Sequence, residues 1–418
     1  MGLQLCQLCE IAYFVTDKIP LEKVLLTDYV TTDSLLPNKE GRCVAQNLPP
    51  QKCALTHYKC GDVLVANIRP YLKKIWFADR EGGASADVLV FRAKSGHSQE
   101  FLYASLLQDS FYDYVMKGKK GSKMPRGDKA QIMRYSIPKL SLAEEACIGN
   151  MILSFCTKIN INRQINDNLE AMAKQLYDYW FVQFDFPNEE GKPYKSNGGV
   201  MVWNEDLHMS IPCTWNTCLL SDYIGSNNTG DWGFDEPAKK RSIKVGCIRG
   251  ADIVKLNDLP IRYIKDNNTS KLLSAWDIVI EVSGGSPTQA TGRSAFVTPG
   301  VLKRNGGNLT CSNFCHAFTM KDYKASAYFY FMWRMFYDNN NMFNFEGKTS
   351  GIKNFMTDTF LANKWLDVPT ALLDLFFERV KVIYEQIDNN IEEINALTKQ
   401  RDELLPLLMN GQASVNSD

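Results

Sequence analysis

Two long stretches of the chain carry apolar residues at mostly three- and four-residue steps, the pattern of amphipathic helices. The apolar positions of the first stretch are Ile148, Ile152, Phe155, Ile159, Ile165, Leu169, Met172 and Leu176. Those of the second are Phe376, Val380, Ile383, Ile387, Ile391, Ile394, Leu397, Leu404 and Leu408. So narrow a stripe is typical of a coiled-coil seam, and the polar interruptions Asn162, Asn166 and Arg401 are of the kind that fixes its register. Helices of about 38 residues run about 57 Å, and we predict that the two pair antiparallel.

Each helical stretch follows a region with the same order of patterns. A buried-strand pattern at residues 61–65 returns at residues 276–280, and an aromatic helical stretch opens into a polar Gly/Lys loop at 117–129 and again at 338–354. Ile137-Pro138 and Val368-Pro369 then precede the two long helices. A period of this length indicates duplicated domains rather than a solenoid.

The repeat predicts a mixed α/β (α+β) fold in which two globular domains in tandem are separated by the two long helices. The domains are residues 1–139 and 211–369, the helices are 140–187 and 370–410, and the remaining segments are a turn region at 188–210 and a tail at 411–418. Pro187 is expected to end the first helix. The aromatic run at 328–333 is expected to be a buried helix and not a base-stacking surface, because exposed aromatic side chains at that density would aggregate.

Charge follows the same division. The net charge is zero, but residues 1–139 hold 20 Lys and Arg against 14 Asp and Glu, and residues 211–369 hold 18 against 14. The two helical regions are acidic, with 3 basic against 6 acidic residues in 140–187 and 4 against 9 in 370–418. Basic domains between acidic helices suit a polyanionic partner for the domains alone. No apolar run is long enough for a membrane span, the N-terminus is a poor signal peptide and the 12 cysteines read as reduced thiols, so a cytoplasmic location is expected.

One stretch of the chain resembles a known family. Residues 168–187, NLEAMAKQLYDYWFVQFDFP, followed by NEEGKPY at 188–194, closely resemble the end of the central helix in specificity subunits of Type I restriction-modification systems. At two positions the chain departs from the Glu-Gln pair that the family often shows after the proline: it has Ala143-Glu144-Glu145 in the first copy and Ala371-Leu372-Leu373-Asp374 in the second.

The resemblance implies two target-recognition domains, each reading one half of a bipartite site in double-stranded DNA, held apart by two antiparallel spacer helices. It further implies that the helices dock two modification (methyltransferase) subunits, and that restriction (ATP-dependent translocase and endonuclease) subunits join outside them. The chain itself is then expected to be no enzyme and to hold no cofactor, because S-adenosylmethionine serves the modification subunits and ATP and Mg²⁺ serve the restriction subunits.

Candidate DNA contacts lie in loops at matching places of the two copies. Arginine and asparagine side chains can read guanine and adenine edges, lysines neutralise phosphates, and glycines let the backbone approach the duplex. The candidates in the first copy are Asn67, Arg69, Lys73, Lys74, Lys117, Lys119, Lys120, Lys123 and Arg126. Those in the second copy are Ser286, Thr288, Gln289, Arg293, Lys348, Thr349, Ser350 and Lys353. For each set a solvated surface loop is the alternative, and for the basic residues of 239–244 it is the preferred one.

The sequence holds only incomplete versions of known catalytic and metal-binding patterns. Six residues separate Gly285 from Gly292 where a phosphate-binding Walker A loop has four, so ATP binding is not expected. Asp277 and Glu281 lack the following lysine of a nuclease-like site, and the cysteine and histidine spacings match no common zinc pattern. We therefore predict neither a catalytic nor a metal site. Two other functions stay open: a stand-alone DNA-acting enzyme such as a nuclease, and a coiled-coil scaffold that does not bind DNA.

Overall fold

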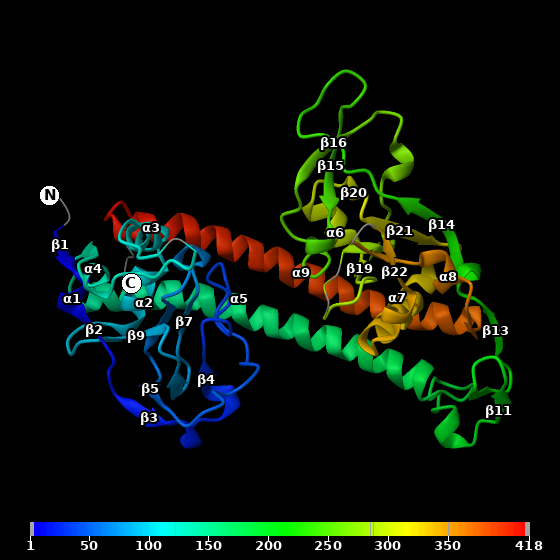
Figure 1. Ribbon diagram of the computed structural model, residues 1–418, viewed down its shortest axis with the longest axis horizontal. Coiled ribbons are helices and arrows are strands. Elements are labelled where there is room, and N and C mark those ends of the chain that lie inside the picture. Colours follow the sequence, from blue (N-terminus) through cyan, green and yellow to red (C-terminus); the bar gives the residue numbers. More distant parts are fainter. Residues whose placement is uncertain (1–3, 122, 285, 287, 350–351, 414–418) are drawn as a thin grey trace. The chain divides into compact units, whose positions relative to one another are not determined.

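The computed structural model describes residues 4–121, 123–284, 286, 288–349 and 352–413. The chain forms two compact units, Met1–Gln164 with Glu393–Asp418, and Ile165–Glu392. Both long helices, α5 (Leu142–Tyr177) and α9 (Thr370–Met409), contribute residues to each unit (Figure 1). None of the helices in the described part of the chain is long and apolar enough to cross a membrane.

Two four-stranded sheets form the globular part of the first unit. The antiparallel sheet has the order β2-β9-β6-β7, with β2 at Ala12–Phe14, β9 at Val88–Ala93, β6 at Val63–Ala66 and β7 at Ile75–Phe77. The other has the order β3-β5-β8-β4, with β3 at Lys18–Pro20, β5 at Ala54–Tyr58, β8 at Gly82–Ala84 and β4 at Tyr29–Val30, which runs parallel to β8. The strands β1 (Leu5–Gln7) and β10 (Ser136–Pro138) pair separately. The short helices are α1 (Leu8–Ile11), α2 (Gln99–Leu107), α3 (Asp109–Lys117) and α4 (Lys129–Ile132).

The globular part of the second unit repeats the antiparallel sheet. Its order is β14-β21-β17-β19, with β14 at Ile224–Thr229, β21 at Cys315–Met320, β17 at Ile278–Glu281 and β19 at Ser294–Phe296. A second sheet holds β16 (Ile261–Ile264), β15 (Ile243–Ile248) and β20 (Leu309–Cys311), and a third holds β18 (Ser283–Gly284), β23 (Ile352–Phe355) and β22 (Glu346–Thr349). Two antiparallel strand pairs are β11 (Met201–Asn204) with β12 (Met209–Pro212), and β13 (Asn216–Leu219) with β24 (Lys364–Asp367). The short helices are α6 (Pro299–Arg304), α7 (Ser326–Asp338) and α8 (Thr357–Leu361).

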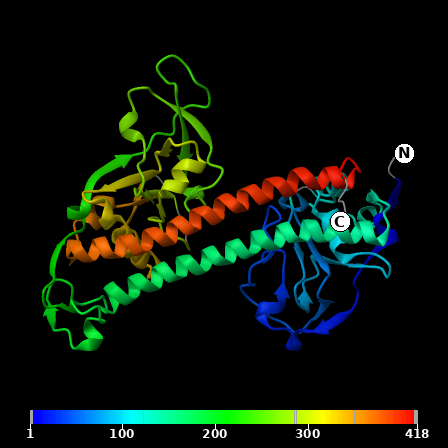
Figure 2. The same ribbon diagram turned by 180° about the vertical axis from the view of Figure 1, so that it is seen from behind.

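The two long helices pair antiparallel, as predicted, and lie side by side in both views (Figures 1 and 2). Within the first unit, the Asn162 amide donates to Glu393 at 2.7 Å, and Arg401 donates to the thiol of Cys156 at 3.9 Å. Within the second unit, the side-chain amides of Asn390 and Asn166 are joined at 2.8 Å. The predicted interruptions of the seam therefore contact the facing helix, so that they fix the register of the pair.

The predicted apolar seam is wrong in the middle of α5. Ile165 and Met172 are 40% and 55% exposed, whereas Asn162, Ala173 and Tyr177 are buried. An α-helix turns by about 20° per heptad relative to a strict seven-residue repeat, so the facing positions change along so long a helix. In addition, each end of the pair also packs into a globular core: Ile148, Ile152, Leu405 and Leu408 in the first unit, and Tyr177, Phe376 and Val380 in the second.

The first long helix ends before Pro187, the predicted end point. A single π-helical turn, Asp178–Val182, follows α5, and Phe184 takes a left-handed conformation with φ 60°. Trp180, Phe181 and Phe184 are each 2–3% exposed. Burying these three rings turns the backbone out of the helix several residues before the proline.

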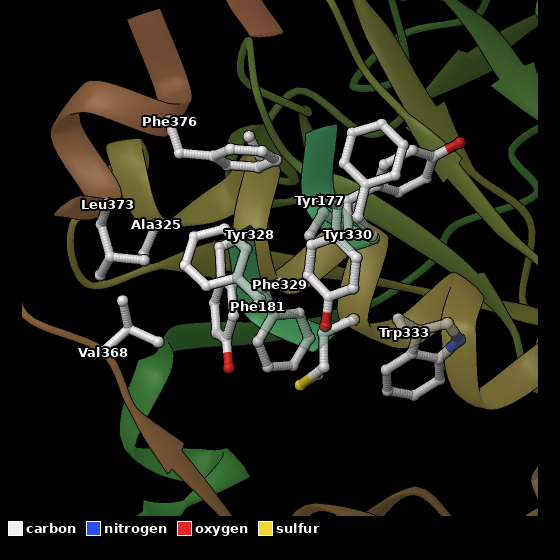
Figure 3. Close-up of a cluster of buried hydrophobic side chains, with 14 of the residues drawn as sticks. Tyr177, Phe181, Ala325, Tyr328, Phe329, Tyr330, Trp333, Val368, Leu373 and Phe376 are labelled. Carbon is white, nitrogen blue, oxygen red and sulfur yellow. The ribbon is translucent and has the colours of Figure 1, made fainter. Parts of the chain in front are cut away.

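The aromatic run of the second copy forms α7 and is buried, as predicted. Tyr328, Phe329, Phe331 and Trp333 are each at most 2% exposed. Tyr328 packs with Phe181 of the π-helical turn at 4.8 Å (Figure 3), and Phe331 packs with Phe376 of α9 at 6.2 Å, all within the same unit. This cluster joins the helix pair to the globular part of the second unit.

The acidic positions that depart from the family pattern anchor the two helices. Glu145 is 1% exposed, and its carboxylate lies 2.8 Å from Nδ1 of His97 and accepts the amide of Ser98 at 2.9 Å. In the second copy, Asp374 accepts from Lys324 at 3.0 Å. Both carboxylates face their own globular region and tie the start of a long helix to it.

Candidate nucleic-acid interface

In the first copy, the structure brings the two predicted loops together. The amide of Arg69 donates to the carbonyl of Pro125 at 2.9 Å, and the amide of Gly127 donates to the carbonyl of Asn67 at 3.3 Å. Lys120 and Arg126 exchange two backbone hydrogen bonds at 2.9 and 3.0 Å, which closes the Gly/Lys loop into a tight hairpin. Arg69 in the β6–β7 turn and Lys123 in the Gly/Lys loop are 54 residues apart in the sequence. The backbone hydrogen bonds bring the turn and the loop together, so they form one surface.

The β6–β7 turn has a strained backbone. Arg69 and Lys73, with φ 51° and 50°, stand on either side of the 3-10 turn Pro70–Leu72. A side chain other than glycine in the left-handed region costs about 1–3 kcal/mol, and such strain concentrates at functional sites. Tyr71 at the tip is 50% exposed. Sequence reasoning missed Tyr71, although an aromatic residue after a proline in a basic turn was a signal for it.

Most basic side chains of the Gly/Lys loop point to solvent. Lys117, Lys119 and Lys123 are exposed, and none of them has an ion pair with a described residue. Lys120 pairs with Asp128 at 2.6 Å, and its hydrogen bond holds the pKa of that carboxyl at about 2. Arg126 pairs with Asp87 at 3.0 Å. Because these pairs are exposed, they cost little to open when a stronger anion arrives.

Three predicted contacts of the first copy are turned inward instead. Lys73 pairs with Asp109 at 2.9 Å, and Lys74 donates to the carbonyl of Thr32 at 2.5 Å. The side-chain amide oxygen of Asn67, Oδ1, is buried beside Gly127, without a hydrogen-bond partner among the described residues. The three residues are half-buried in this arrangement, whereas Arg69 is exposed.

In the second copy, the two matching loops also meet, here as a small sheet. Strand β18 follows β17 and pairs with β23, so that Ser283 lies opposite Asn354, and β23 pairs with β22. Ser286 and Gln289 exchange backbone hydrogen bonds at 3.0 and 3.2 Å, and Thr288 and Gln289 are exposed. Lys348 and Thr349 belong to β22. Ser350 lies outside the described residues.

Two basic candidates of the second copy are held by carboxylates. Arg293 donates to both oxygens of Glu281, at 2.8 and 2.7 Å, and to the carbonyl of Gly250 at 2.8 Å. Lys353 pairs with Glu346 at 2.8 Å. The side chains of Arg293 and Lys353 are 18% and 19% exposed. This setting argues against a direct DNA contact by either residue.

The acidic residues of the second copy have structural partners. Asp277 accepts from the hydroxyl of Thr319 and from the amide of Ser274, both at 2.7 Å. Glu281 is bound to Arg293. Neither Asp277 nor Glu281 is therefore free to act as a catalytic carboxylate of a nuclease. Over the described ranges, His, Cys, Asp and Glu side chains do not gather in a group of three or more that could hold a metal ion.

Two known proteins resemble this chain in sequence, one of them over most of its length. No family model matches. The specificity subunit of Type I restriction enzyme MjaIX from Methanocaldococcus jannaschii is 26% identical over 334 residues, 77% of this chain and 71% of that protein. The specificity subunit of Type I restriction enzyme HindI from Haemophilus influenzae is 30% identical over 169 residues, 38% of this chain and 36% of that protein.

A solved structure has the same fold. The Type I restriction-modification S subunit from M. genitalium superposes with a TM-score of 0.56 at 13% identity, covering 98% of this chain and 96% of the other. The shared fold, the two sequence matches and the repeated domains with their paired helices agree with one another. The chain therefore resembles the specificity subunits of Type I restriction-modification systems in both sequence and fold.

Proposed function

We propose that this chain reads a bipartite site in double-stranded DNA, one half with each globular copy. A Type I specificity subunit recognises the DNA target within its complex and is itself non-catalytic, and the cofactor chemistry belongs to the modification and restriction subunits. The observation that carries the bipartite proposal is that each copy joins the same two loops, one after the central strand and one after the aromatic helix, into one surface. A chain with two such surfaces has what it needs to read two half-sites.

The proposed contacts are the candidates that the structure leaves at the surface. In the first copy they are Arg69, Lys117, Lys119, Lys120, Lys123 and Arg126. In the second they are Ser286, Thr288 and Gln289, while Lys348, Thr349 and Ser350 stay predictions from the sequence. Exposed lysines supply the sequence-independent attraction to phosphates, and Arg69 and Gln289 are the side chains suited to reading base edges.

The long helices are proposed to dock two modification subunits, with restriction subunits joining outside them and the whole assembly acting in the cytoplasm. They are also proposed to set the gap between the half-sites. Helix α5 has 36 residues and α9 has 40, which at 1.5 Å per residue correspond to about 54 and 60 Å. A continuous helix keeps a distance that a flexible linker would not.

Mapping of methylated adenines across the genome of a host that expresses this chain with its modification subunit tests the proposal. We expect a motif in two parts with a fixed gap. Removing one heptad from each helix, residues 159–165 and 391–397, shortens the pair by about 10 Å and should shorten the gap by about three base pairs. A single continuous motif would contradict reading by two copies, and an unchanged gap would reject the helices as its ruler. Replacing the same heptads with heptads of equal length is the control.

A further inference from the structure

In each copy, a basic side chain just before the last strand of the antiparallel sheet reaches across to the other sheet. Lys74 precedes β7, and its Nζ donates to the carbonyl of Thr32, two residues after β4, at 2.5 Å. Arg293 precedes β19, and its Nη2 donates to the carbonyl of Gly250, two residues after β15, at 2.8 Å. We call the connection between β6 and β7 in the first copy, and between β17 and β19 in the second, the reading turn of that copy. Each contact joins the end of the reading turn to the second sheet of the same copy.

The two contacts occupy equivalent positions. The carbonyl of Lys74 accepts the amide of Ala66 at 3.1 Å, and the carbonyl of Arg293 accepts the amide of Glu281 at 2.8 Å, at the end of the matching strands β6 and β17. The acceptors match as well. Two residues before Thr32, the carbonyl of Val30 accepts from Ser85 at 2.9 Å, and two residues before Gly250, that of Ile248 accepts from Ser312 at 2.8 Å. The same cross-sheet contact is therefore made twice in the chain.

The chemistry of the contact differs between the copies. Lys74 lies opposite Ala66 and has no ion pair with a described carboxylate, whereas Arg293 lies opposite Glu281, whose side chain is 4% exposed. A Cβ atom on Gly250 or Gly284 would lie 2.6 or 2.7 Å from Glu281 Oε1, so both glycines make room for the ion pair. A lysine in one copy and an arginine–glutamate pair in the other hold the same carbonyl, which points to the contact itself as the required feature.

We propose that Lys74 and Arg293 are positioning residues, which fix the reading turn of each copy to its second sheet and so sharpen the base selection of that copy without touching DNA. The inference rests on the proposed function, because it assigns Lys74 to the turn that carries Arg69 and Arg293 to the loop that carries Gln289. Removing the cation leaves a half-buried carbonyl without its donor and releases one end of the loop.

The test uses Lys74→Met and the double variant Arg293→Met with Glu281→Ala, which leaves no buried carboxylate unpaired, in the complete complex with its modification subunit. Each variant should lower the preference for the cognate half-site over single-base variants by about tenfold, the effect of losing one charged hydrogen bond, and only in the half that its own copy reads. The slope of DNA affinity against salt should not change, because no phosphate contact is lost. A fall of about 1 in that slope would identify a direct phosphate contact and overturn the positioning role.

Exchange variants separate this role from general loss of folding. Arg293→Lys with Glu281→Ala gives the second copy the arrangement of the first, and Lys74→Arg with Ala66→Glu does the reverse. Both should keep the selectivity of the parent chain within about twofold, since the carbonyl keeps a charged donor. Loss of selectivity in both exchange variants would overturn the proposal. A continuous motif for the parent chain would instead reject bipartite reading, whereas a bipartite motif left unchanged by both Met variants would reject only the positioning role.

Discussion

The two copies place different reading turns on the same frame, the four-stranded antiparallel sheet that each copy contains. The connection between β6 and β7 in the first copy has eight residues and carries Arg69 in a strained, basic turn. The matching connection between β17 and β19 has twelve, and its exposed residues, Thr288 and Gln289, are uncharged. The flanking strands nevertheless pair in the same order and direction. The frame therefore tolerates a change in both the length and the charge of the segment it presents.

The frame itself keeps its backbone geometry while its side chains change. Asp62 and Asp277 begin the two central strands, and each accepts the amide of the residue three positions earlier at 2.7 Å. The residue before each is left-handed, Gly61 with φ 87° and Trp276 with φ 74°. The remaining partner differs, because Asp62 pairs with the guanidinium of Arg92 where Asp277 has only the hydroxyl of Thr319.

This difference predicts the largest effect. Arg92 donates to both oxygens of Asp62, at 2.7 Å each, so Asp62→Asn should lower the free energy of unfolding by about 3 kcal/mol, by leaving a largely buried charge poorly paired. Asp277→Asn should cost about 1 kcal/mol, because the Thr319 hydroxyl can reverse its hydrogen bond. Chemical denaturation of the full chain measures both. Equal losses would show that the two aspartates have the same role despite their partners.

The same pair gives a pH dependence of defined sign. Burial raises the pKa of Asp277 above its ordinary value. The native state then binds a proton before the unfolded state does, so lowering the pH toward that pKa stabilises the parent chain relative to Asp277→Asn. The gap in unfolding free energy between parent and variant should therefore widen as the pH falls, and a narrowing gap would contradict the raised pKa.

A smaller effect separates the two reading segments. Replacing Lys119, Lys120 and Lys123 with alanine should reduce the slope of log affinity against log salt by about 2.7 for B-DNA contacts. Between 50 and 200 mM salt, the affinity of the parent chain should therefore fall about 40-fold more than that of the variant. Replacing Ser286, Thr288 and Gln289 with alanine is the matched control. It should leave the slope unchanged and relax the second half-site. An unchanged slope for the lysine variant in the assembled complex would remove the Gly/Lys loop from the interface.

A further small effect concerns the left-handed position before Asp62. Gly61→Ala should cost about 1–2 kcal/mol, because an alanine at positive φ is strained, and its Cβ would also meet the Gln99 side chain at 1.7 Å. Gly96, with φ 90° and no atom within 4 Å of an added Cβ, is the control for strain alone. Thermal unfolding should place Gly61→Ala below Gly96→Ala. The reverse order would mean that Gln99 moves aside at no cost, as a flexible side chain can.

Patterns along the chain predicted the helix pair, the duplication and the burial of α7, because each depends on spacing within a segment. The exposure of Ile165 and Met172 was not predicted, because the side of a long helix that becomes buried depends on what packs beside it. Among the candidate contacts, the exposed lysines of a polar glycine-rich loop follow from composition. The inward turn of Lys74 and Arg293 does not, because their acceptors lie 42 and 43 residues away in the sequence and meet them only in the folded sheets.

The make-up of the first unit has a consequence for biosynthesis. Its core contains Leu405, Leu408 and Met409 from the end of α9 together with Ile148 and Ile152 from α5. A ribosome makes the first recognition domain early, yet the residues that complete its core emerge only after the whole second copy has been translated. The core of the N-terminal domain is therefore completed last. A nonsense mutation in the codons just before Leu405 would remove Leu405, Leu408 and Met409 from the core of the domain that was synthesised first.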